Sequence, residues 1–339
     1  MKILALGSLF IILTFGLSKI SLYLLNKFKI VDIPNPRGMH HKPIPRGGGI
    51  SILISLIIYF VFIHNSFSFN NHIYAYISLV CISILGFIDD LKSINFKIRL
   101  IFQFIFSILI IYSFSLDSLY ELIDTNLLLV VYLILIIFIV WQINLFNFMD
   151  GINGICTIQA ILFFLLMSLI TFFNEHYYFT QKYLIFGCIS VGFLPLNFPK
   201  ALVFLGDCGS YLLGALIAYS TIEVLYLGVE FFLIGIILMS AFYLDATITL
   251  LSRMIRREKF FDAHKEHLYQ LMTRLNKSHS KTVIFFAMIH IATTSIAYFY
   301  IFIFKVNPIF FSIIIFCILS ICYILFKKKI YREVLQKNL

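Results

Sequence analysis

Carboxylate side chains interrupt the long apolar segments of this sequence at four places. Asp89 and Asp90 close one segment, Asp150 follows another, and Asp207 and Asp245 belong to two more. A carboxylate costs about 2.5–3.5 kcal/mol at the centre of a membrane helix, so such residues usually mark a pathway or a site. Two adjacent carboxylates also repel each other, and both stay ionised only when a cation is near. The expected chemistry therefore involves a bound cation.

The segment NLFNFMDGING adds amide groups to the Asp150 carboxylate. Asn144, Asn147 and Asp150 follow one another at intervals of three residues, which places them along one stripe of a helix. An amide oxygen and a carboxylate on one face are hard ligands of the kind that Mg²⁺ accepts. Gly151 and Gly154 then allow the backbone to turn or to approach a ligand closely. The alternative is an asparagine helix cap followed by a glycine break.

Asp207 stands between two glycines in the segment FLGDCGSYLLG, directly before an apolar stretch. Asp207 or Ser210 could cap the helix that begins there. The same geometry would expose the N–H groups of the first helical turn to a phosphate. For Asp89 and Asp90 the simpler alternative is a solvated helix end. Because these two point to different sides of a helix, they need not share one task.

Residues 252–282 form the longer of two extended polar segments. They contain eight lysines and arginines, including Lys265, together with His264 and His267. This composition suits an anionic ligand such as a nucleotide diphosphate. The alternative is a basic loop that touches anionic lipid headgroups.

Residues 26–47 form the other polar segment, which ends in PRGGG. Lys42 and Arg46 stand beside the glycine run and are further candidates for binding an anion. The segment is not a P-loop, because the Gly-Lys-Ser/Thr ending is missing. The glycines either hold a loop near phosphates or merely start the next apolar segment.

The elements that must position these residues are membrane helices. Hydrophobic residues make up 61% of the 339-residue chain and charged residues only 12%, with a mean hydropathy of +0.99. A water-soluble domain carries about 25% charged residues, so lipid must be the solvent for most of this surface. Apolar runs of about 20 residues predict helices, since barrel strands would alternate over about 10 residues. We expect an all-α integral membrane bundle of about eleven helices, with ten as the alternative, near residues 3–25, 48–68, 72–90, 99–116, 127–147, 155–173, 182–198, 208–226, 229–251, 283–304 and 308–326.

Lysine and arginine are distributed unevenly between the loops. If the N-terminus lies outside, almost all of them face the cytoplasm, and the opposite face keeps only Lys2, Lys182 and Lys305, with acidic residues such as Glu223. The C-terminus is then cytoplasmic. The net charge of +10 is explained by topology, so we expect no nucleic-acid partner. Residues 1–339 form one domain, whose active-site face consists of the cytoplasmic loops 26–47, 91–98, 148–154, 199–207 and 252–282.

Five motifs stand in order along the chain: HKPIPRGGG, IDD after the third apolar segment, NLFNFMDGINGI, FLGDCGS, and a basic loop with histidine. This series resembles the polyprenyl-phosphate N-acetylhexosamine-1-phosphate transferases, glycosyltransferase family 4, over nearly the whole chain. The resemblance implies ten or eleven helices around a cytoplasmic cleft in the bacterial inner membrane, with Mg²⁺ or Mn²⁺ as cofactor. It also implies a UDP-N-acetylaminosugar donor and an undecaprenyl phosphate acceptor, with release of UMP. A homodimer is left open.

Roles for single residues follow from the motifs that match. By resemblance, Asp207 is the best metal ligand, Asn147 and Asp150 lie near metal and nucleotide, and Asp89 binds or deprotonates the acceptor phosphate. The residues expected to take part in catalysis are Asp89, Asp90, Asp150 and His267. Those expected to bind the metal are Asp207, Asn147 and Asp150. Those expected to bind the nucleotide are Asn144, Asn147, Lys42, Arg46, His264 and Lys265.

The loop EHLYQ departs from the family pattern. His267 matches the first histidine of the motif, but Tyr269 and Gln270 stand where further histidines are usual. The departure favours a subgroup of enzymes that start O-antigen or capsule glycans, in lipopolysaccharide or cell wall biosynthesis. Their donor is a 6-deoxyhexosamine such as FucNAc or QuiNAc. The close alternative is a GlcNAc-specific enzyme of the teichoic acid or enterobacterial type.

Two other classes of function compete with a transferase. A secondary transporter would place its ionisable residues near the bilayer midplane, often in two related halves. Here the carboxylates gather at one edge, and the sequence has no evident repeat. An inactive scaffold would be expected to have lost an acidic motif, and none is lost.

Overall fold

The computed structural model describes residues 2–33, 42–62, 66–114, 125–258 and 265–337. Within these ranges the protein is almost entirely helical, as the apolar runs predict. Its helices and strands are α1 (Lys2–Lys27), β1 (Val31–Asp32), β2 (Ile44–Pro45), α2 (Ile50–Phe62), α3 (Ser66–Leu91), α4 (Phe96–Tyr112), α6 (Thr125–Met149), α7 (Ile155–Phe173), α8 (Tyr177–Asn197), α9 (Gly206–Glu223), η1 (Val224–Tyr226), α10 (Val229–Leu238), α11 (Ser240–Ile255), α12 (Leu268–Asn276), α13 (His279–Tyr298), η2 (Phe299–Ile303) and α14 (Pro308–Gln336).

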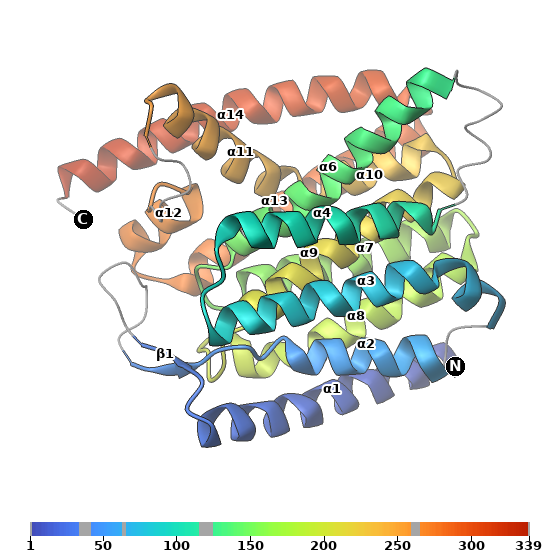
Figure 1. Ribbon diagram of the computed structural model, residues 1–339. Helices are drawn as coiled ribbons and strands as arrows, with labels where there is room; N and C mark the ends of the chain where they lie inside the picture. The colour runs from blue at the N-terminus through green and yellow to red at the C-terminus, as the bar shows by residue number, and fades with distance from the viewer. Residues whose placement is uncertain (1, 34–41, 63–65, 115–124, 259–264, 338–339) are drawn as a thin grey trace.

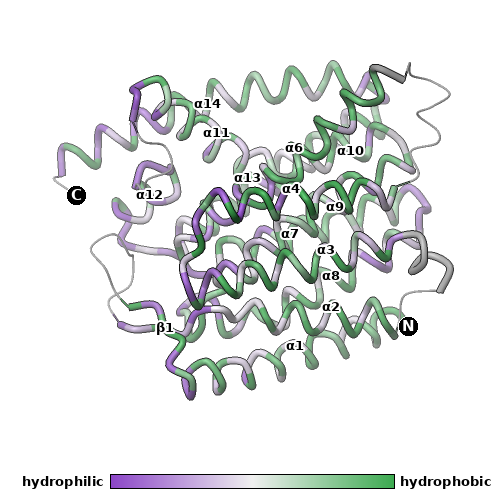
Figure 2. The backbone as a smooth tube through the Cα atoms, viewed as in Figure 1, coloured by the Kyte–Doolittle hydropathy of each residue, from purple (hydrophilic) through white to green (hydrophobic). Residues whose placement is uncertain are grey.

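The long helices lie side by side as a bundle, and most of them share one axis direction (Figure 1). The hairpin of β1 and β2 and the short helix α12 lie at one end of the bundle. Figure 2 shows polar residues gathered at this same end, while the helix bodies are apolar. The helix α1 begins at the opposite end from the one where α14 finishes (Figure 1). This arrangement is the one expected of a chain whose two termini lie on different sides of a membrane.

Among the described residues, eight helices are long and apolar enough to cross a membrane. A ninth span results if α10 and α11 count as one, although the two helices meet at an angle of 64°. All eleven predicted windows contain helix, but three differ from the prediction. The second corresponds to α2, which has only 13 residues, the fourth corresponds to α4, which has 17 residues, and the ninth is broken at Met239. The structure therefore supports a polytopic all-α membrane protein, and its described residues contain fewer regular spans than the apolar runs suggest.

The helix α9 forms the centre of the bundle, with 94% of its spanning window buried. It packs mainly against α3 and α6, because glycines at the contacts let the backbones approach closely. A Cβ atom at Gly86 of α3 would lie 2.3 Å from the backbone oxygen of Asp207. A Cβ atom at Gly49 would lie 2.2 Å from the Cα atom of Gly209. These contacts bring the start of α2 and the end of α3 to the first turn of α9.

Candidate active site

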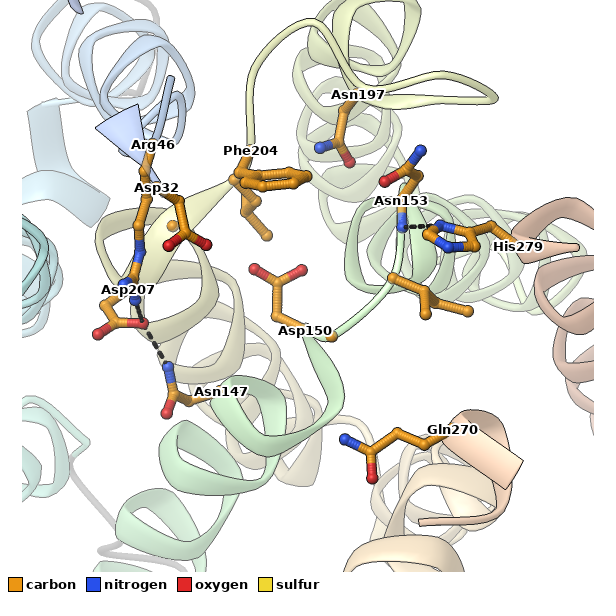
Figure 3. A pocket seen from close by; sticks show the side chains of 14 residues that line it. Asp32, Arg46, Asn147, Asp150, Asn153, Asn197, Phe204, Asp207, Gln270 and His279 are labelled. Atoms are coloured by element: carbon orange, nitrogen blue, oxygen red, sulfur yellow. Dashed lines mark hydrogen bonds and ion pairs between the residues drawn. The ribbon is translucent and has the colours of Figure 1, made fainter. Parts of the chain in front are cut away.

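A cavity of about 360 Å³ opens at the polar end of the bundle (Figure 3). Its wall comes from the hairpin, the end of α6, the start of α9, α12 and α13, elements that are far apart in the sequence. The chemically functional side chains of this wall are Asp32, Arg46, Asn147, Asp150, Asn153, Asn197, Phe204, Asp207, Gln270 and His279. Of the four acidic clusters in the sequence, those of Asp150 and Asp207 thus lie together in this cavity wall.

Asp207 is the centre of the polar network in this wall. Its Oδ1 atom accepts a hydrogen bond from Asn147 Nδ2 at 2.7 Å. The same atom forms an ion pair with Arg46 Nη2 at 2.6 Å. Its side chain keeps 13% of its surface exposed, so a ligand can reach it. Asn147 and Arg46, both expected near the nucleotide, therefore lie beside the predicted metal ligand. Figure 3 shows the Asn147 side chain turned towards Asp207.

Asp90 holds the start of α9 in place. Its two carboxylate oxygens accept hydrogen bonds from the backbone N–H groups of Asp207 and Cys208, at 2.9 and 3.0 Å. Its side chain is fully buried and also pairs with Arg46 Nε at 2.6 Å. Gly206, which precedes Asp207, has a φ of +74°, and a Cβ atom there would lie 2.5 Å from the Asp90 carboxylate. Asp90 thus acts as a capping group for the helix that carries Asp207, and it does not line the cavity.

Asp89 faces a different set of partners, as expected for a neighbour on the other side of a helix. It accepts hydrogen bonds from Arg99 Nη1 at 2.5 Å, from the N–H group of Ile94 at 2.7 Å and from the Tyr211 hydroxyl at 3.2 Å. Its side chain is 4% exposed, whereas that of Arg99 is 28% exposed. Asp89 therefore orients Arg99, which is the more accessible of the two.

Asp150 follows the last residue of α6 and points into the cavity (Figure 3). Desolvation raises the pKa of this carboxyl group to about 8, and the neighbouring charge of Asp207 adds to the shift. Arg46 opposes the shift only in part. A cation close to both carboxylates would favour the ionised form of Asp150.

The donor set of this region fits Mg²⁺ or Mn²⁺. Two guanidinium groups face five carboxylates, so three negative charges are in excess when all are ionised; the groups are Arg46, Arg99, Asp32, Asp89, Asp90, Asp150 and Asp207. Across the described part of the chain, no three His, Cys, Asp or Glu side chains gather closely enough to hold a metal alone. Mg²⁺ commonly takes one or two carboxylates together with substrate phosphates and water. Asp207, Asp150 and the Asn147 amide meet that description.

Several predicted ligand residues lie elsewhere. Asn144 donates to Gln103 Oε1 at 2.6 Å and to the Val140 oxygen at 2.8 Å, so it joins α6 to α4 and does not extend the Asn147 stripe into the cavity. Lys42 and Lys265 are described but do not line the cavity. His264 lies outside the described residues. The prediction of nucleotide contacts is therefore not supported by the positions of Asn144, Lys42 and Lys265.

His267 also lies behind the cavity wall. It is 3% exposed, its Nδ1 atom is 3.4 Å from Asp245 Oδ1, and its ring stacks on that of Tyr269. Asp245, which the sequence groups with the other site carboxylates, caps α12 and does not face the cavity. Gln270, three residues after His267, is the residue of this loop that lines the cavity.

Asn153, Asn197, Phe204 and His279 line the cavity although none of them was among the predicted site residues. Asn153 donates its backbone N–H to His279 Nδ1 at 3.2 Å and its amide to the Pro199 oxygen at 3.2 Å. The sequence could have indicated two of them, because Asn153 lies within NLFNFMDGING and Phe204 lies shortly before Asp207. For His279, 126 residues from Asn153, only the packing of α13 against α7 brings the two together.

Comparison with known proteins identifies this arrangement. Residues 72–225 match the family model described as glycosyl transferase family 4, a range that contains Asp89, Asp90, Asn147, Asp150 and Asp207. The probable undecaprenyl-phosphate N-acetylglucosaminyl 1-phosphate transferase of Bacillus subtilis is 24% identical, over 76% of this chain and 74% of the relative.

Two further relatives are also named as transferases. The undecaprenyl-phosphate alpha-N-acetylglucosaminyl 1-phosphate transferase of Thermotoga maritima is 26% identical, over 78% of this chain and 79% of its own. The phospho-N-acetylmuramoyl-pentapeptide-transferase of Staphylococcus saprophyticus is 30% identical, over 51% of this chain and 60% of its own. Together with the membrane bundle and its polar cavity, these matches show a glycosyl-1-phosphate transferase whose residues 72–225 match glycosyl transferase family 4.

Proposed function

We propose that the protein transfers an N-acetylhexosamine 1-phosphate from a UDP-sugar to undecaprenyl phosphate and releases UMP. The observation that carries the proposal is the meeting of Asp207, Asn147, Asp150 and Arg46 in one cavity at the polar end of membrane helices. A donor that is soluble in water can enter from that end, while the long tail of a lipid acceptor stays in the bilayer. The names of the relatives point to the same acceptor and to an N-acetylglucosamine donor.

The acidic part of the cavity suits the diphosphate of the donor. Asp207, Asp150 and the Asn147 amide would hold Mg²⁺ or Mn²⁺, which supplies charge neutralisation for the departing UMP phosphate. Arg46 adds a fixed positive charge on the same side, because its guanidinium group is held between Asp90 and Asp207.

The other part of the cavity suits a nucleoside. Phe204 presents a half-buried ring, and the amides of Asn153 and Asn197 lie on the same side of the cavity as His279 (Figure 3). A flat aromatic ring flanked by amide groups can stack on a base and bind its polar edge. We therefore place the uridine group of the donor near Phe204, with its phosphates towards Asp207.

The acceptor phosphate has a second pKa near 6 and is mostly dianionic at neutral pH, so a strong general base is not required. Asp89, the predicted candidate for deprotonation, would act instead through Arg99, whose guanidinium group it orients. Arg99 would attract the acceptor phosphate, and the protein's main contribution would be alignment of two anions.

The donor sugar decides the pathway. The departure at Tyr269 and Gln270 favours a 6-deoxyhexosamine and the start of an O-antigen or capsule glycan, whereas the named relatives favour N-acetylglucosamine. In either case the protein would act in the bacterial inner membrane, with its polar end towards the cytoplasm.

The test uses the purified full-length protein in detergent, with undecaprenyl phosphate, Mg²⁺ and a panel of UDP-N-acetylhexosamines. We expect UMP release that requires both the lipid and the metal, and a new lipid with the mass of a polyprenyl diphosphate sugar. The donor with the highest kcat/KM identifies the sugar. Absence of UMP with every donor, from protein that is folded and stabilised by Mg²⁺, would contradict the proposal.

A further inference from the structure

A further buried carboxylate, Asp245 of α11, lies outside the cavity and is connected to its wall. The side chain is fully buried, and its oxygens accept hydrogen bonds from the N–H groups of Leu268 and Tyr269, at 2.8 and 3.1 Å. The Tyr323 hydroxyl of α14 donates to the same carboxylate at 2.9 Å. A negative charge at the first N–H groups of a helix is favourable, so Asp245 fixes where α12 begins.

The first turn of α12 in turn touches the segment that carries Asp150. The Tyr269 hydroxyl donates to the backbone oxygen of Phe148 at 3.0 Å. A Cβ atom at Gly151 would lie 2.1 Å from that hydroxyl oxygen, so the ring lies directly against the turn. The next residue, Gln270, lines the cavity itself. One continuous set of hydrogen bonds therefore connects Asp245 with the turn on which Asp150 stands.

We propose that Asp245 is a positioning residue of the active site, which acts through Tyr269 to hold the Phe148–Gly151 turn, and with it Asp150, in the geometry that binds the donor. The inference rests on the proposed function for its kinetic consequences. It does not place Asp245 in contact with a substrate. It also explains the role of Tyr323, whose hydroxyl group connects α14 to the same carboxylate.

The first test removes one hydroxyl group. Tyr269→Phe keeps the ring and its packing but loses the hydrogen bond to Phe148. A single neutral hydrogen bond is worth about 0.5–1.5 kcal/mol, so we expect the KM for the UDP-sugar to rise by about twofold to tenfold. The KM for undecaprenyl phosphate should stay unchanged, because Asp89 and Arg99 lie on other elements.

The matched control is Tyr243→Phe. Tyr243 lies on α11, two residues from Asp245, and its buried hydroxyl has no hydrogen-bond partner among the described residues. The same loss of one hydroxyl group should leave both KM values unchanged. Equal effects of Tyr243→Phe and Tyr269→Phe on donor KM would overturn the proposal.

Asp245→Asn tests the carboxylate and its connection to Tyr269. The amide keeps one acceptor for the N–H groups of α12, and we expect donor KM to rise by about tenfold or more, since hydrogen bonds to charged groups are the stronger ones. In the double variant with Tyr269→Phe, the effect should be smaller than the product of the single effects, because both act on one turn. Independent, multiplicative effects would overturn the proposal.

Hydrogen exchange measured by mass spectrometry separates this inference from the proposed function, because it needs no turnover. In Asp245→Asn we expect faster exchange both in peptides covering 268–270 and in peptides covering 148–151, with the melting temperature little changed. This result would support the positioning role even if no donor were turned over. Faster exchange confined to 268–270 would overturn it, because Asp245 would then cap α12 without affecting the Asp150 turn.

Discussion

Two buried clusters of charged residues lie at opposite ends of the central helix α9. At the polar end, Asp207 stands among carboxylates, amides and Arg46, and part of its side chain is exposed to the cavity. At the other end, Glu223 pairs with Lys182 of α8, and the two side chains are 2% and 1% exposed. The Tyr219 hydroxyl donates to Glu223 at 2.9 Å, and the rings of Tyr178 and Phe179 lie 5.2 Å from the Lys182 ammonium group.

The difference lies in how each cluster balances its charge. Lys182 and Glu223 neutralise each other, and the surrounding rings complete the shell of the ammonium group. Around Asp207 the carboxylates outnumber the guanidinium groups, and a cavity adjoins them. A fully buried, neutralised ion pair has no free group to bind a ligand. Carboxylates in excess beside a cavity, by contrast, can bind a cation. Burial of charge inside a membrane bundle therefore does not by itself mark a site.

The largest expected effect comes from Asp207→Asn. Loss of this carboxylate should lower kcat/KM by about a thousandfold, or about 4 kcal/mol of transition-state stabilisation, because the proposed cation would lose its main ligand. UMP release measures the activity, and a melting curve with and without Mg²⁺ gives a second measurement. Mg²⁺ should stabilise the wild-type protein but not this variant; equal stabilisation would contradict the metal assignment.

Arg46→Lys should have the next largest effect. Arg46 reaches Asp90 with Nε and Asp207 with Nη2, and a single ammonium group cannot keep both contacts. We expect kcat/KM to fall by about tenfold to hundredfold, because the carboxylates would shift relative to the donor phosphates. Steady-state kinetics with varied UDP-sugar measure the loss. Wild-type kinetics would mean that the bridge is dispensable.

Glu223→Gln should destabilise the protein without affecting the chemistry. Removal of one partner from a buried ion pair costs about 3–5 kcal/mol, since the remaining charge is left in an apolar environment. We expect a lower melting temperature in detergent and unchanged UMP release per folded molecule. A selective loss of turnover at unchanged stability would show that this cluster is functional, and would remove the contrast with Asp207.

The smallest effect is expected when the pair is neutralised as a whole. The double variant Lys182→Met with Glu223→Gln removes both charges and keeps an acceptor for the Tyr219 hydroxyl. Its stability should lie within about 1 kcal/mol of the wild type, because replacing a complete buried pair is often neutral. Thermal melting compares it with Glu223→Gln alone. A double variant as unstable as the single one would indicate that the pair stabilises the protein beyond its charge balance.

The membrane class, the helical architecture and the family could all be predicted from the sequence. Apolar runs of about 20 residues leave little choice but helices, and the order of the acidic motifs is specific. The same logic counted Lys182 and Glu223 as loop charges on the outer face, yet both lie inside helices and are buried. Hydropathy reports the average of a segment, so it does not reveal a charge that is neutralised within the bundle.

The division of work among the acidic residues was decided only by the tertiary structure. Asp89 and Asp90 are neighbours in the chain, yet one orients Arg99 and the other caps α9, 117 residues away. Asn144 and Asn147 share a helical stripe, yet they face α4 and α9. The sequence alone determined which side chains reach the polar end of the membrane bundle. Which of them meet a ligand depends on how the helices pack, because glycine contacts such as that of Gly86 with Asp207 set the register between segments that the sequence separates.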